Sequence, residues 1–426
     1  MSDYWAILMF YLPLGIIGAW RWGVWLFRRL VSLAYRPISE AYDAPVSVIT
    51  PVYNENPEVF RQALQSWQAN NPQEIIAVID HTDTRCIQEF REFAKQYSEA
   101  KLIVTETPGK RPALAEGIKA AKGKIVALVD SDTIWDKSLL DKALSPFSDP
   151  EVGGVTTRQN VLEPKTLAQR IFDIQLDLRY LHEVPFLAAK SNALTCLSGR
   201  TALYRSRAIL PLVDDMVNET FNGKPCIGGD DKRLTYLMEA AGWKTRYQSS
   251  AQVYTPGATK LSTLFKQRTR WSRNSWRADL RALWQDWVWK HPLLAFHLID
   301  RLICPFTLTL SLTYFLVSLF SKMWLPVAIL LAWYVLSRGV KIIPHLLRRP
   351  ADVVLLPAYV FVNFATAIIR IYSLLTLNHQ DWITRRDNLR APKTGHHNLI
   401  LARIGTLAII FSLCLITVYS RGALTF

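Results

Sequence analysis

The sequence predicts a membrane protein with a doubly wound, mostly parallel α/β sheet in the cytosol. The sheet is expected to join a transmembrane helical bundle with interfacial amphipathic helices. Apolar segments of about 20 residues, long enough to cross a bilayer, lie near both ends of the 426-residue chain. Between them, from about Pro45 to Ser250, strand patterns alternate with helix patterns, which is typical of a parallel sheet covered by helices.

The apolar residues are concentrated in a few segments. The strongest are Tyr4 to Phe27, Ile303 to Leu336, Val353 to Thr376 and Leu399 to Ser420. The first is too long for the apolar part of a signal peptide, contains Arg21 and is not followed by a small-residue cleavage site. We therefore expect a retained anchor. The second segment is expected to form two spans, about Ile303 to Phe320 and Trp324 to Val340.

The net charge of +15 is distributed unevenly. Basic residues cluster beside the apolar segments, for example at Arg28, Arg29, Arg348, Arg349 and Arg386. This placement follows the positive-inside rule and favours contact with anionic membrane lipids. It predicts a multi-pass protein of the plasma membrane, in a bacterium the inner membrane, with the α/β domain in the cytosol. No nucleic-acid partner is predicted, because no module of basic and aromatic residues stands out.

The segment Val353 to Thr376 is unusual among the apolar stretches. Basic residues flank it on both sides, and it contains Asn363 and Arg370. We expect it to lie in the interface or to re-enter the membrane, with a true span as the alternative. The last apolar segment would then place the C-terminus outside.

These observations divide the chain into six parts. They are an N-terminal anchor with its basic flank (1–42), the α/β domain (43–258), interfacial amphipathic helices (259–298), a transmembrane hairpin (299–350), an interfacial or re-entrant segment with the loop after it (351–396) and a C-terminal transmembrane helix (397–426). The five cysteines form no CxxC pair, so neither a disulfide framework nor a zinc site is predicted.

An apolar strand in KIVALVDSDTIWD ends in two carboxylates, Asp130 and Asp132. Side chains alternate along a strand, so we expect both carboxylates on the same side, where they repel unless a cation lies near them. Carboxylate oxygens suit Mg²⁺ or Mn²⁺, which commonly bridge a protein to a substrate diphosphate. The alternative is a strand-to-turn junction in which Asp and Ser act as turn and capping residues.

Other polar residues also fall at the ends of predicted strands. They are Tyr53, Glu55, Asp80 and Lys110. In a doubly wound sheet, ligands bind at the carboxyl ends of the strands, so these residues are expected to share one site. The chain lacks both GxGxxG and GxxxxGK[ST], which excludes dinucleotide-type and P-loop phosphate binding.

Two later motifs add candidate residues. In CIGGDDKRLTYLME, Asp230 and Asp231 begin a predicted helix, and we expect one to cap it and the other to act as a general base. In FKQRTRWSRNSWR, Gln267, Arg270 and Trp271 share one face of a predicted helix and suit a phosphate and a sugar ring. An amphipathic helix on the membrane surface is the alternative there, and the two interpretations are compatible.

With these motifs in this order, the chain resembles the membrane-embedded processive family-two glycosyltransferases. It is most similar to hyaluronan and chitin synthases and more distantly to cellulose synthase. The resemblance runs from about Pro45 to Arg386 and rests on PVYNE, GKR, DSD, CLSG, GDD, QRTRW and WITR. It implies a GT-A-like fold for residues 43–258 and a metal-dependent, inverting hexosyltransferase that uses a UDP-sugar.

The resemblance also implies roles for individual residues. Donor binding falls to Tyr53, Glu55, Asp80, Lys110, Arg111, Asp130, Gln267, Arg270 and Trp271; metal binding to Asp132 and Asp130; catalysis to Asp231 with Asp230; acceptor binding to Cys196, Ser198, Gly199 and Trp271; and closure over the nucleotide to Trp382, Thr384 and Arg385. For Cys196, simple packing as a small buried residue is the alternative.

Two departures from the family pattern concern the product. Arg200 stands where hyaluronan synthases have Pro after CLSG, and Ile383 stands where the gating motif usually has Gly. Three functions are therefore considered. They are a processive β-polysaccharide synthase that also translocates its product, a transferase that adds one sugar to a membrane lipid, and a non-catalytic scaffold. The intact motifs disfavour the scaffold, WITR and the helical C-terminal half favour the polymer synthase, and the modest length favours the lipid transferase.

Overall fold

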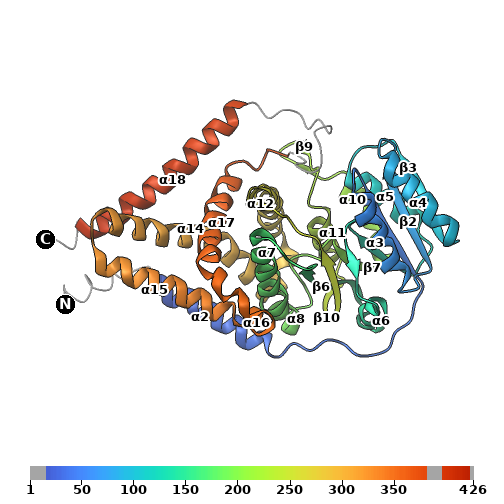
Figure 1. Ribbon diagram of the computed structural model, residues 1–426, viewed down its shortest axis with the longest axis horizontal. Helices are drawn as coiled ribbons and strands as arrows, with labels where there is room; N and C mark the ends of the chain where they lie inside the picture. The colour runs from blue at the N-terminus through green and yellow to red at the C-terminus, as the bar shows by residue number, and fades with distance from the viewer. Residues whose placement is uncertain (1–15, 381–395, 423–426) are drawn as a thin grey trace.

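The computed structural model describes residues 16–380 and 396–422. An α/β domain lies at one end of the molecule and a group of long helices at the other (Figure 1). The division between a sheet-containing domain and a helical bundle, as predicted from the hydropathy pattern, is confirmed.

An eight-stranded sheet forms the centre of the α/β domain, in the order β3-β2-β1-β4-β7-β6-β10-β5. The strands are β1 (Val46–Val52), β2 (Glu74–Asp80), β3 (Ala100–Thr105), β4 (Ile125–Val129), β5 (Ile134–Trp135), β6 (Val152–Val161), β7 (Thr201–Arg205) and β10 (Lys244–Thr255). The first four are parallel as predicted, and β6 is parallel to β10. Strands β7 and β5 run antiparallel to their neighbours, so the whole sheet is mixed. A separate hairpin joins β8 (Thr220–Phe221) to β9 (Lys224–Pro225).

Helices cover both faces of the sheet. They are α3 (Pro57–Gln68), α4 (Thr84–Gln96), α5 (Lys110–Ala120), α6 (Leu139–Leu144), α7 (Leu167–Leu178), α8 (Val184–Lys190), α9 (Ser206–Ile209), α10 (Val213–Val217) and α11 (Asp230–Ala240), with short helices η1 (Ser145–Ser148), η2 (Arg179–Glu183) and η3 (Leu210–Leu212). Helix α3 begins as its sequence predicts: the side chain of Asn56 accepts a hydrogen bond from the Glu58 N–H at 2.9 Å, and Pro57 occupies the first turn.

The two faces bury two different cores. One face buries Phe60, Trp67 and Phe90 of α3 and α4 against the sheet. The core of the other face includes Ile174 of α7 and continues without interruption to Leu298 and other side chains of the long C-terminal helices. The α/β domain and the helical bundle therefore share one apolar core, which fixes their relative position.

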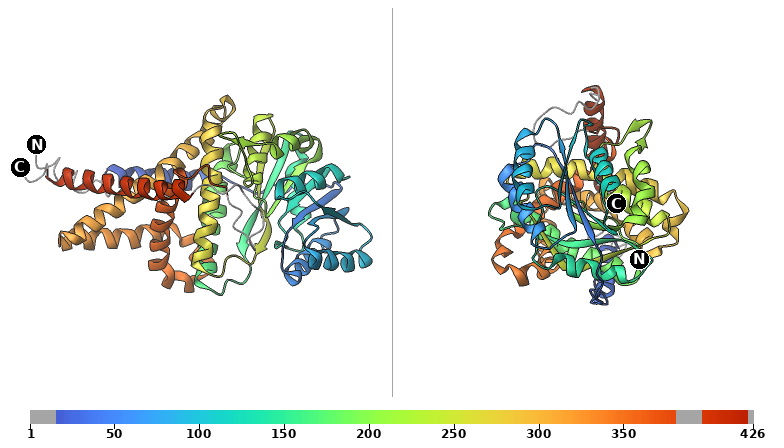
Figure 2. Two further views of the ribbon diagram at one scale, coloured as in Figure 1. Left: turned by 90° about the horizontal axis from the view of Figure 1, so that it is seen from above. Right: turned by 90° about the vertical axis from the view of Figure 1, so that its right-hand side faces the viewer.

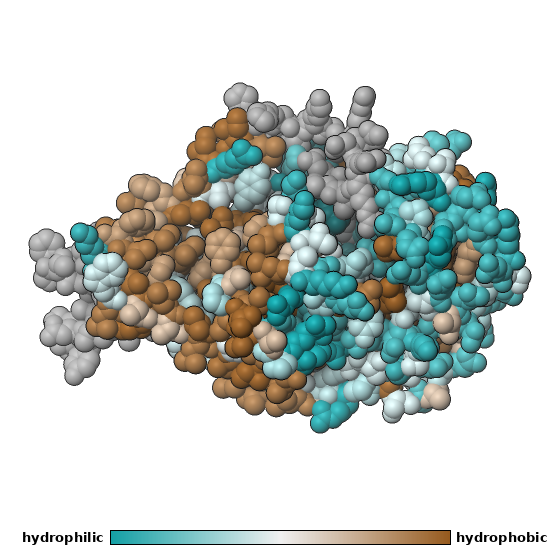
Figure 3. Space-filling view, viewed as in Figure 1, coloured by the Kyte–Doolittle hydropathy of each residue, from teal (hydrophilic) through white to brown (hydrophobic). Residues whose placement is uncertain are grey.

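Among the described residues, five long helices build the bundle. They are α2 (Ile16–Ser32), α14 (Pro292–Phe320), α15 (Trp324–Lys341), α17 (Leu356–Leu374) and α18 (His396–Gly422). Three described segments are long and apolar enough to cross a membrane by length and composition, namely Pro292–Phe320, Trp324–Lys341 and Pro350–Leu374. Apolar side chains cover the surface of this half of the molecule, whereas the α/β half is largely hydrophilic (Figure 3). Such a belt matches the surface that a bilayer covers.

Helix α17 corresponds to the segment that we expected to lie in the interface. Its length and composition also qualify it as a span, the alternative stated above. It runs across α2 and α15 in the first view and across α18 in the view from above (Figures 1 and 2). The interfacial position of this segment stays a prediction.

Helix α12 (Leu261–Leu283) connects the two parts of the molecule. Residues 259–298, which we expected to form interfacial amphipathic helices, contain α12 with Gln267, then the short α13 (Asp286–Trp289) and the first turns of α14. Three side chains of α12 hold α17 and its C-terminal end. Arg273 donates to the hydroxyl of Thr376 at 2.9 Å, Trp276 to the carbonyl of Arg370 at 2.9 Å, and Arg277 to the carbonyl of Leu377 at 2.8 Å.

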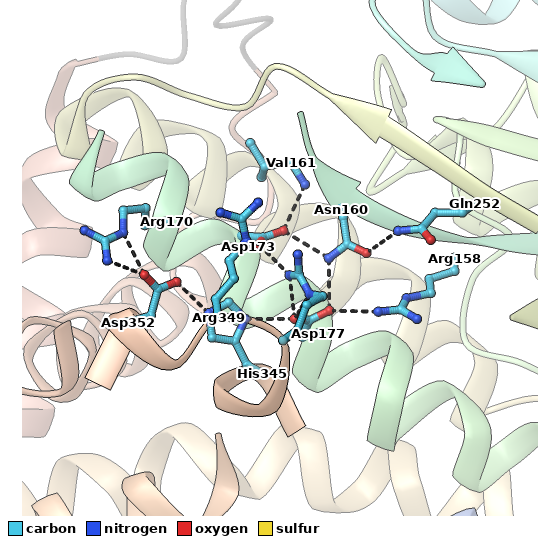
Figure 4. A network of polar contacts seen from close by, with 11 residues as sticks. Arg158, Asn160, Val161, Arg170, Asp173, Asp177, Gln252, His345, Arg349 and Asp352 are labelled. Atoms are coloured by element: carbon cyan, nitrogen blue, oxygen red, sulfur yellow. Dashed lines mark hydrogen bonds and ion pairs between the residues drawn. The ribbon is translucent and has the colours of Figure 1, made fainter. Parts of the chain in front are cut away.

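A buried ionic network fastens α7 to the segment between α15 and α17 (Figure 4). That segment comprises α16 (Ile343–Arg348) and the short helix η4 (Pro350–Leu355). Arg348 donates to Asp177 at 2.6 Å and to Asp173, and His345 lies 2.8 Å from Asp177. Burial alone would raise the pKa of Asp177, but hydrogen bonds from His345, Asn160 and Arg348 lower it to about 2.

Replacing Arg348 by Met should destabilise this junction. Two buried carboxylates would lose hydrogen bonds from a charged donor, at a cost of about 1.5–3 kcal/mol. Thermal unfolding in detergent, followed by tryptophan fluorescence, should show a lower midpoint. Arg61→Met is the control, since Arg61 pairs with Glu58 and Glu89 on the exposed surface and its loss should change little. Equal midpoints for the two variants would contradict a stabilising role for the network.

Candidate active site

A cavity of about 680 Å³ opens at the carboxyl ends of β1, β2 and β4 and continues between α2, α14 and α17. Most of the predicted site residues line it. They are Tyr53, Glu55, Asp80, Lys110, Asp130, Asp132, Cys196, Ser198, Gly199, Asp230, Asp231, Gln267, Arg270 and Trp271. The end at the strands is called the donor end below, and the end between the long helices the membrane end.

The two carboxylates of the DSD motif lie in a turn rather than on a strand. Strand β4 ends at Val129, and the Thr133 N–H donates to the carbonyl of Asp130 at 3.0 Å. We expected Asp130 and Asp132 to lie on a strand, with alternation placing both on one side. That expectation was wrong, because the strand ends before them. Both side chains nevertheless line the cavity, because the turn itself faces it.

Lys110 provides a positive charge between two of the acidic motifs. Its ammonium group lies 2.7 Å from Asp130 and 3.1 Å from Asp230. Burial would lower the pKa of Lys110, but the carboxylates of Asp130 and Asp230 outweigh it and raise that pKa. For Asp230, burial acts to raise the pKa, and Lys110 and Arg111 lower it overall. The lysine thus ties the end of β4 to the start of α11.

Glu55 and Asp80 shape the turns around the donor end. Glu55 is 3% exposed, and its carboxylate accepts hydrogen bonds from the hydroxyl of Ser131 and the N–H of Asn56, both at 2.8 Å. Asp80 accepts from the Thr82 N–H at 2.9 Å. Glu55 therefore braces the DSD turn from the PVYNE loop, and Asp80 holds the turn after β2.

Arg111 does not line the cavity. It is 2% exposed, and its guanidinium donates to the carbonyl of Met216 at 2.6 Å, to the carboxylate of Glu219 at 2.6 Å and to the carbonyl of Gly228 at 2.9 Å. Its predicted place among the donor-binding residues needs correction: Arg111 holds the loop before Asp230 from behind. A GKR motif alone does not reveal which of two adjacent cations faces the ligand.

The GDD motif places its two carboxylates differently from the prediction. Gly229, with φ of +82°, precedes the first turn of α11, and no side chain caps the helix, so neither Asp230 nor Asp231 is the expected cap. Asp230 is buried against Lys110. Asp231 faces the cavity and accepts hydrogen bonds from the N–H groups of Lys232 at 2.8 Å and Gly199 at 3.4 Å. The helix N-terminus favours both negative charges.

The CLSG loop is pressed against both acidic motifs. A Cβ on Gly199 would lie 3.1 Å from the Lys110 ammonium and 3.7 Å from the Cβ of Asp231, so this position has little room for a side chain. Cys196 also lines the cavity, and burial, followed by the nearby Asp231, raises the pKa of its thiol. The thiol therefore stays protonated beside Asp231, and the loop separates the donor end from the membrane end.

Helix α12 presents the predicted face to the cavity. Gln267, Arg270 and Trp271 all line it. Burial lowers the pKa of Arg270, while Asp230, Asp130 and Asp231 act in the opposite direction. A guanidinium within electrostatic reach of three carboxylates stays charged and faces the donor end. The indole of Trp271 lies 6.0 Å from the Phe172 ring and forms an aromatic wall.

Several residues at the membrane end were not predicted as site residues. They are Arg21, Arg28, Arg179, Glu183, Arg268, Asp300, Arg301 and Arg370. Arg21 and Arg28 both pair with Asp300, the latter at 2.9 Å. Ionisable residues inside or beside apolar helices are a signal for function, and Arg21 and Arg370 carried it in the sequence. The others come together only through packing of distant segments.

The predicted closing residues Trp382, Thr384 and Arg385 lie outside the described residues. The chain just before them contacts the segment that precedes the GDD motif. The Ile227 N–H donates to the side chain of Gln380, and the side chain of Asn222 donates to that of Asn378, both at 3.0 Å.

The folded domain and its motifs agree with comparisons to known proteins. Residues 44–274 match the family model described as "Glycosyltransferase like family 2". The chain belongs to this family. This family-2 glycosyltransferase is 28% identical over 374 residues to an N-acetylglucosaminyltransferase of Rhizobium meliloti, covering 85% of this chain and 87% of that protein. It is 27% identical over 376 residues to a hyaluronan synthase of Streptococcus pyogenes, covering 84% and 87%, and 28% identical over 365 residues to a type 2 glycosyltransferase of Pyricularia oryzae, covering 80% and 74%.

A solved structure confirms the predicted fold. The mannosyltransferase PcManGT of Pyrobaculum calidifontis, in complex with GDP-Man and Mn²⁺, superimposes with a TM-score of 0.56 at 18% identity and covers 90% of this chain and 100% of that one. The glycosyltransferase therefore has a GT-A-like mixed α/β sheet followed by three long apolar helices that can span a membrane.

Two groups of acidic residues in the described part of the chain are candidates for a metal site. At the donor end, Asp130 and Asp132 offer oxygen ligands, which fit Mg²⁺ or Mn²⁺, and Lys110 contacts one oxygen of Asp130. In the ionic network, ligand atoms of Asp173, Asp177 and His345 lie within 4.8 Å of one another.

The second place already has its charges balanced by the protein. Arg348 and Arg349 pair with Asp173, Arg348 and Arg158 pair with Asp177, and both ring nitrogens of His345 contact carboxylates. A metal ion there would have to displace several guanidinium groups.

Asp132→Asn should weaken Mn²⁺ binding by at least about 10-fold, a loss typical even of residues that only orient a metal ligand. Bound Mn²⁺ can be measured by electron paramagnetic resonance in the presence of UDP, independently of activity. Asp173→Asn serves as the comparison and should leave the bound fraction unchanged. If only Asp173→Asn lowered binding, the metal would belong to the ionic network and not to the DSD turn.

Proposed function

We propose that this glycosyltransferase transfers a hexose, with inversion, from a UDP-sugar to an acceptor that enters the membrane end of the cavity. Repeated transfer would extend a β-linked polysaccharide of the hyaluronan, chitin or β-glucan kind. The observation that carries the proposal is the continuity of one cavity from the strand ends, past Asp231 and Trp271, to the space between α2, α14 and α17.

The donor end supports nucleotide-sugar binding. Tyr53, Asp80 and Lys110 lie at the strand ends where a nucleoside would sit, and Gln267 and Arg270 face them from α12. Asp130 and Asp132 would hold a Mg²⁺ or Mn²⁺ ion, which would neutralise charge on the departing diphosphate. Arg270 adds a fixed positive charge on the opposite wall.

The position of Asp231 supports its role as the general base. Two backbone N–H groups, of Lys232 and Gly199, hold its carboxylate at the boundary between the two ends of the cavity. In the transfer step an acceptor oxygen forms a bond to the anomeric carbon as the bond from that carbon to the diphosphate oxygen breaks. The bonding electrons leave with the diphosphate, and the acceptor proton passes to Asp231. Attack opposite the leaving group inverts the configuration.

A second candidate is the addition of one sugar to a membrane lipid. The observation that favours it is the large contribution of α14 and α17 to the cavity wall, through Asp300, Cys304, Tyr359 and Asn363 among others. A lipid headgroup could reach that part of the wall from the bilayer. The relative named hyaluronan synthase supports the polymer instead. The basic flanks of the apolar helices support a protein of the plasma membrane whose α/β domain lies in the cytosol.

A product assay tests the proposal. Membranes containing the enzyme are incubated with radiolabelled UDP-glucose, UDP-N-acetylglucosamine, UDP-glucuronate or GDP-mannose, and products are separated by size and by solvent extraction. Long polymer that is made from UDP-sugars and is not extracted by organic solvent supports the synthase, and a one-sugar lipid supports the second candidate. Incorporation from GDP-mannose alone would refute the proposed donor, and no incorporation from any donor would refute the proposed reaction.

Asp231→Asn should lower turnover by about 100- to 10,000-fold, the usual contribution of a general base. Binding of UDP, measured by calorimetry, should change little, because Asp231 lies toward the acceptor side. Asp215→Asn, on the exposed surface of α10, is the control and should retain full turnover. Near-normal turnover in Asp231→Asn would remove this residue from the mechanism.

A further inference from the structure

The two ends of the cavity carry opposite charges. At the donor end the carboxylates Glu55, Asp80, Asp130, Asp132, Asp230 and Asp231 outnumber Lys110 and Arg270. At the membrane end, α2, η2, α14 and α17 contribute five arginines and two carboxylates, namely Arg21, Arg28, Arg179, Arg301 and Arg370 with Glu183 and Asp300. Asp300 is already paired with Arg21 and Arg28. The wall that faces the acceptor is therefore strongly basic.

Three guanidinium groups meet where this basic wall reaches the transfer centre. Arg200 and Arg268 both lie over the Trp271 ring, at 5.5 Å and 5.3 Å from its centroid, and over the Phe172 ring, at 5.1 Å and 5.3 Å. Arg179, the first residue of the π-helical turn η2, is close enough to lower the pKa of Arg268. Burial is the main cause of that lowering, to about 9, and Arg200 and Arg179 add to it.

These three arginines are held in position without a direct ion pair. None of the ion pairs among the described residues involves Arg179, Arg200 or Arg268. Arg200 donates to the amide oxygen of Gln159 at 2.8 Å, and Arg268 donates to that of Gln175, so neutral groups orient both. The Nε of Arg268 is buried and without a hydrogen-bond partner. The nearest carboxylates act only from a distance: Glu183 and Asp231 act to raise the pKa of Arg179, and Glu183 acts to raise that of Arg268. An anion in direct contact with the three guanidinium groups would offset the repulsion that remains between them.

We propose that Arg179, Arg200 and Arg268 bind the phosphate group of a membrane lipid that accepts the first sugar. This inference rests on the proposed sugar transfer and specifies its acceptor, whether or not a chain then grows.

A phosphate fits the cluster better than a carboxylate does. A carboxylate has two oxygens, which a single arginine can satisfy in a bidentate contact, whereas a phosphate offers enough oxygens for several guanidinium groups. Aromatic faces of Trp271 and Phe172 hold Arg200 and Arg268 in place, which lowers the entropy lost on binding.

A lipid is the source of phosphate that the surroundings favour. The cavity continues from the cluster to Cys304, Tyr359 and Thr366 on the apolar helices α14 and α17. Arg200 follows Gly199, whose N–H contacts Asp231, so a phosphate on the cluster would lie next to the transfer centre.

Binding to the purified full-length enzyme in detergent, without any sugar donor, tests this inference. The probes are a fluorescent long-chain alkyl phosphate and the alcohol and carboxylate of the same chain length. We expect the phosphate to bind at least about 10-fold more tightly than either. Arg200→Gln and Arg268→Gln should each weaken phosphate binding by about 10- to 100-fold, the effect of losing a hydrogen bond from a charged group, and leave alcohol binding unchanged.

Arg207→Gln is the matched control. Arg207 also lies over an indole, 5.4 Å from the centroid of Trp243, but it is exposed and donates to the carbonyl of Pro150 outside the cavity. Its probe binding should equal that of the wild type. UDP binding, measured on every variant, reports whether each is folded and whether the donor end is intact.

Three results would overturn the inference. Equal affinity for the three probes, or phosphate affinity insensitive to both Arg200→Gln and Arg268→Gln, would show that the cluster binds no phosphate. Competition by inorganic phosphate as strong as by the alkyl phosphate would exclude a lipid source. Failure of the proposed function is separate, because it would appear as normal probe binding with no sugar transfer in the product assay.

Discussion

Helix α12 has to serve two environments at once, and the architecture of this glycosyltransferase depends on that constraint. One face carries Gln267, Arg270 and Trp271 into the cavity. Another binds α17 through Arg273, Trp276 and Arg277, and the apolar core of the α/β domain continues past it into the long helices. The sheet cannot move relative to the bundle without disrupting both faces. The nucleotide end and the membrane end of the cavity are consequently held in one fixed alignment.

Charge is arranged along this cavity so that each end suits a different ligand. Lys110 lies between Asp130 and Asp230, which lets the DSD and GDD motifs approach each other in a buried place. Beyond the CLSG loop the wall becomes basic, with Arg200 and Arg268 held by neutral amides and aromatic rings. Asp231 lies at the boundary between the two ends. A general base is needed there, between the acceptor and a donor that carries a negative diphosphate.

Local sequence patterns predicted which residues gather at the site. They did not predict the backbone conformation and the side-chain partners of several of these residues. The strand ends, the helix face of α12 and the acidic pairs all follow from short-range periodicity, and their residues line one cavity. Side-chain partners depend on segments far away in the chain. Asp130 and Asp132 therefore lie in a turn, Arg111 faces Met216 and Gly228 instead of the cavity, and Gly229 leaves Asp231 free of a capping role.

The sequence by itself determined the fold class, the apolar helices and the family, because strand and helix periods, hydropathy and motif order are properties of neighbouring residues. Only the tertiary structure decided what surrounds each charge. The ionic network of Asp173, Asp177 and Arg348, the pairing of Arg28 with Asp300 and the cluster of Arg179, Arg200 and Arg268 join segments that lie up to hundreds of residues apart. A buried charge is stable only when neighbouring groups pair with it or hydrogen-bond to it. Which groups become its neighbours depends on how the whole chain packs.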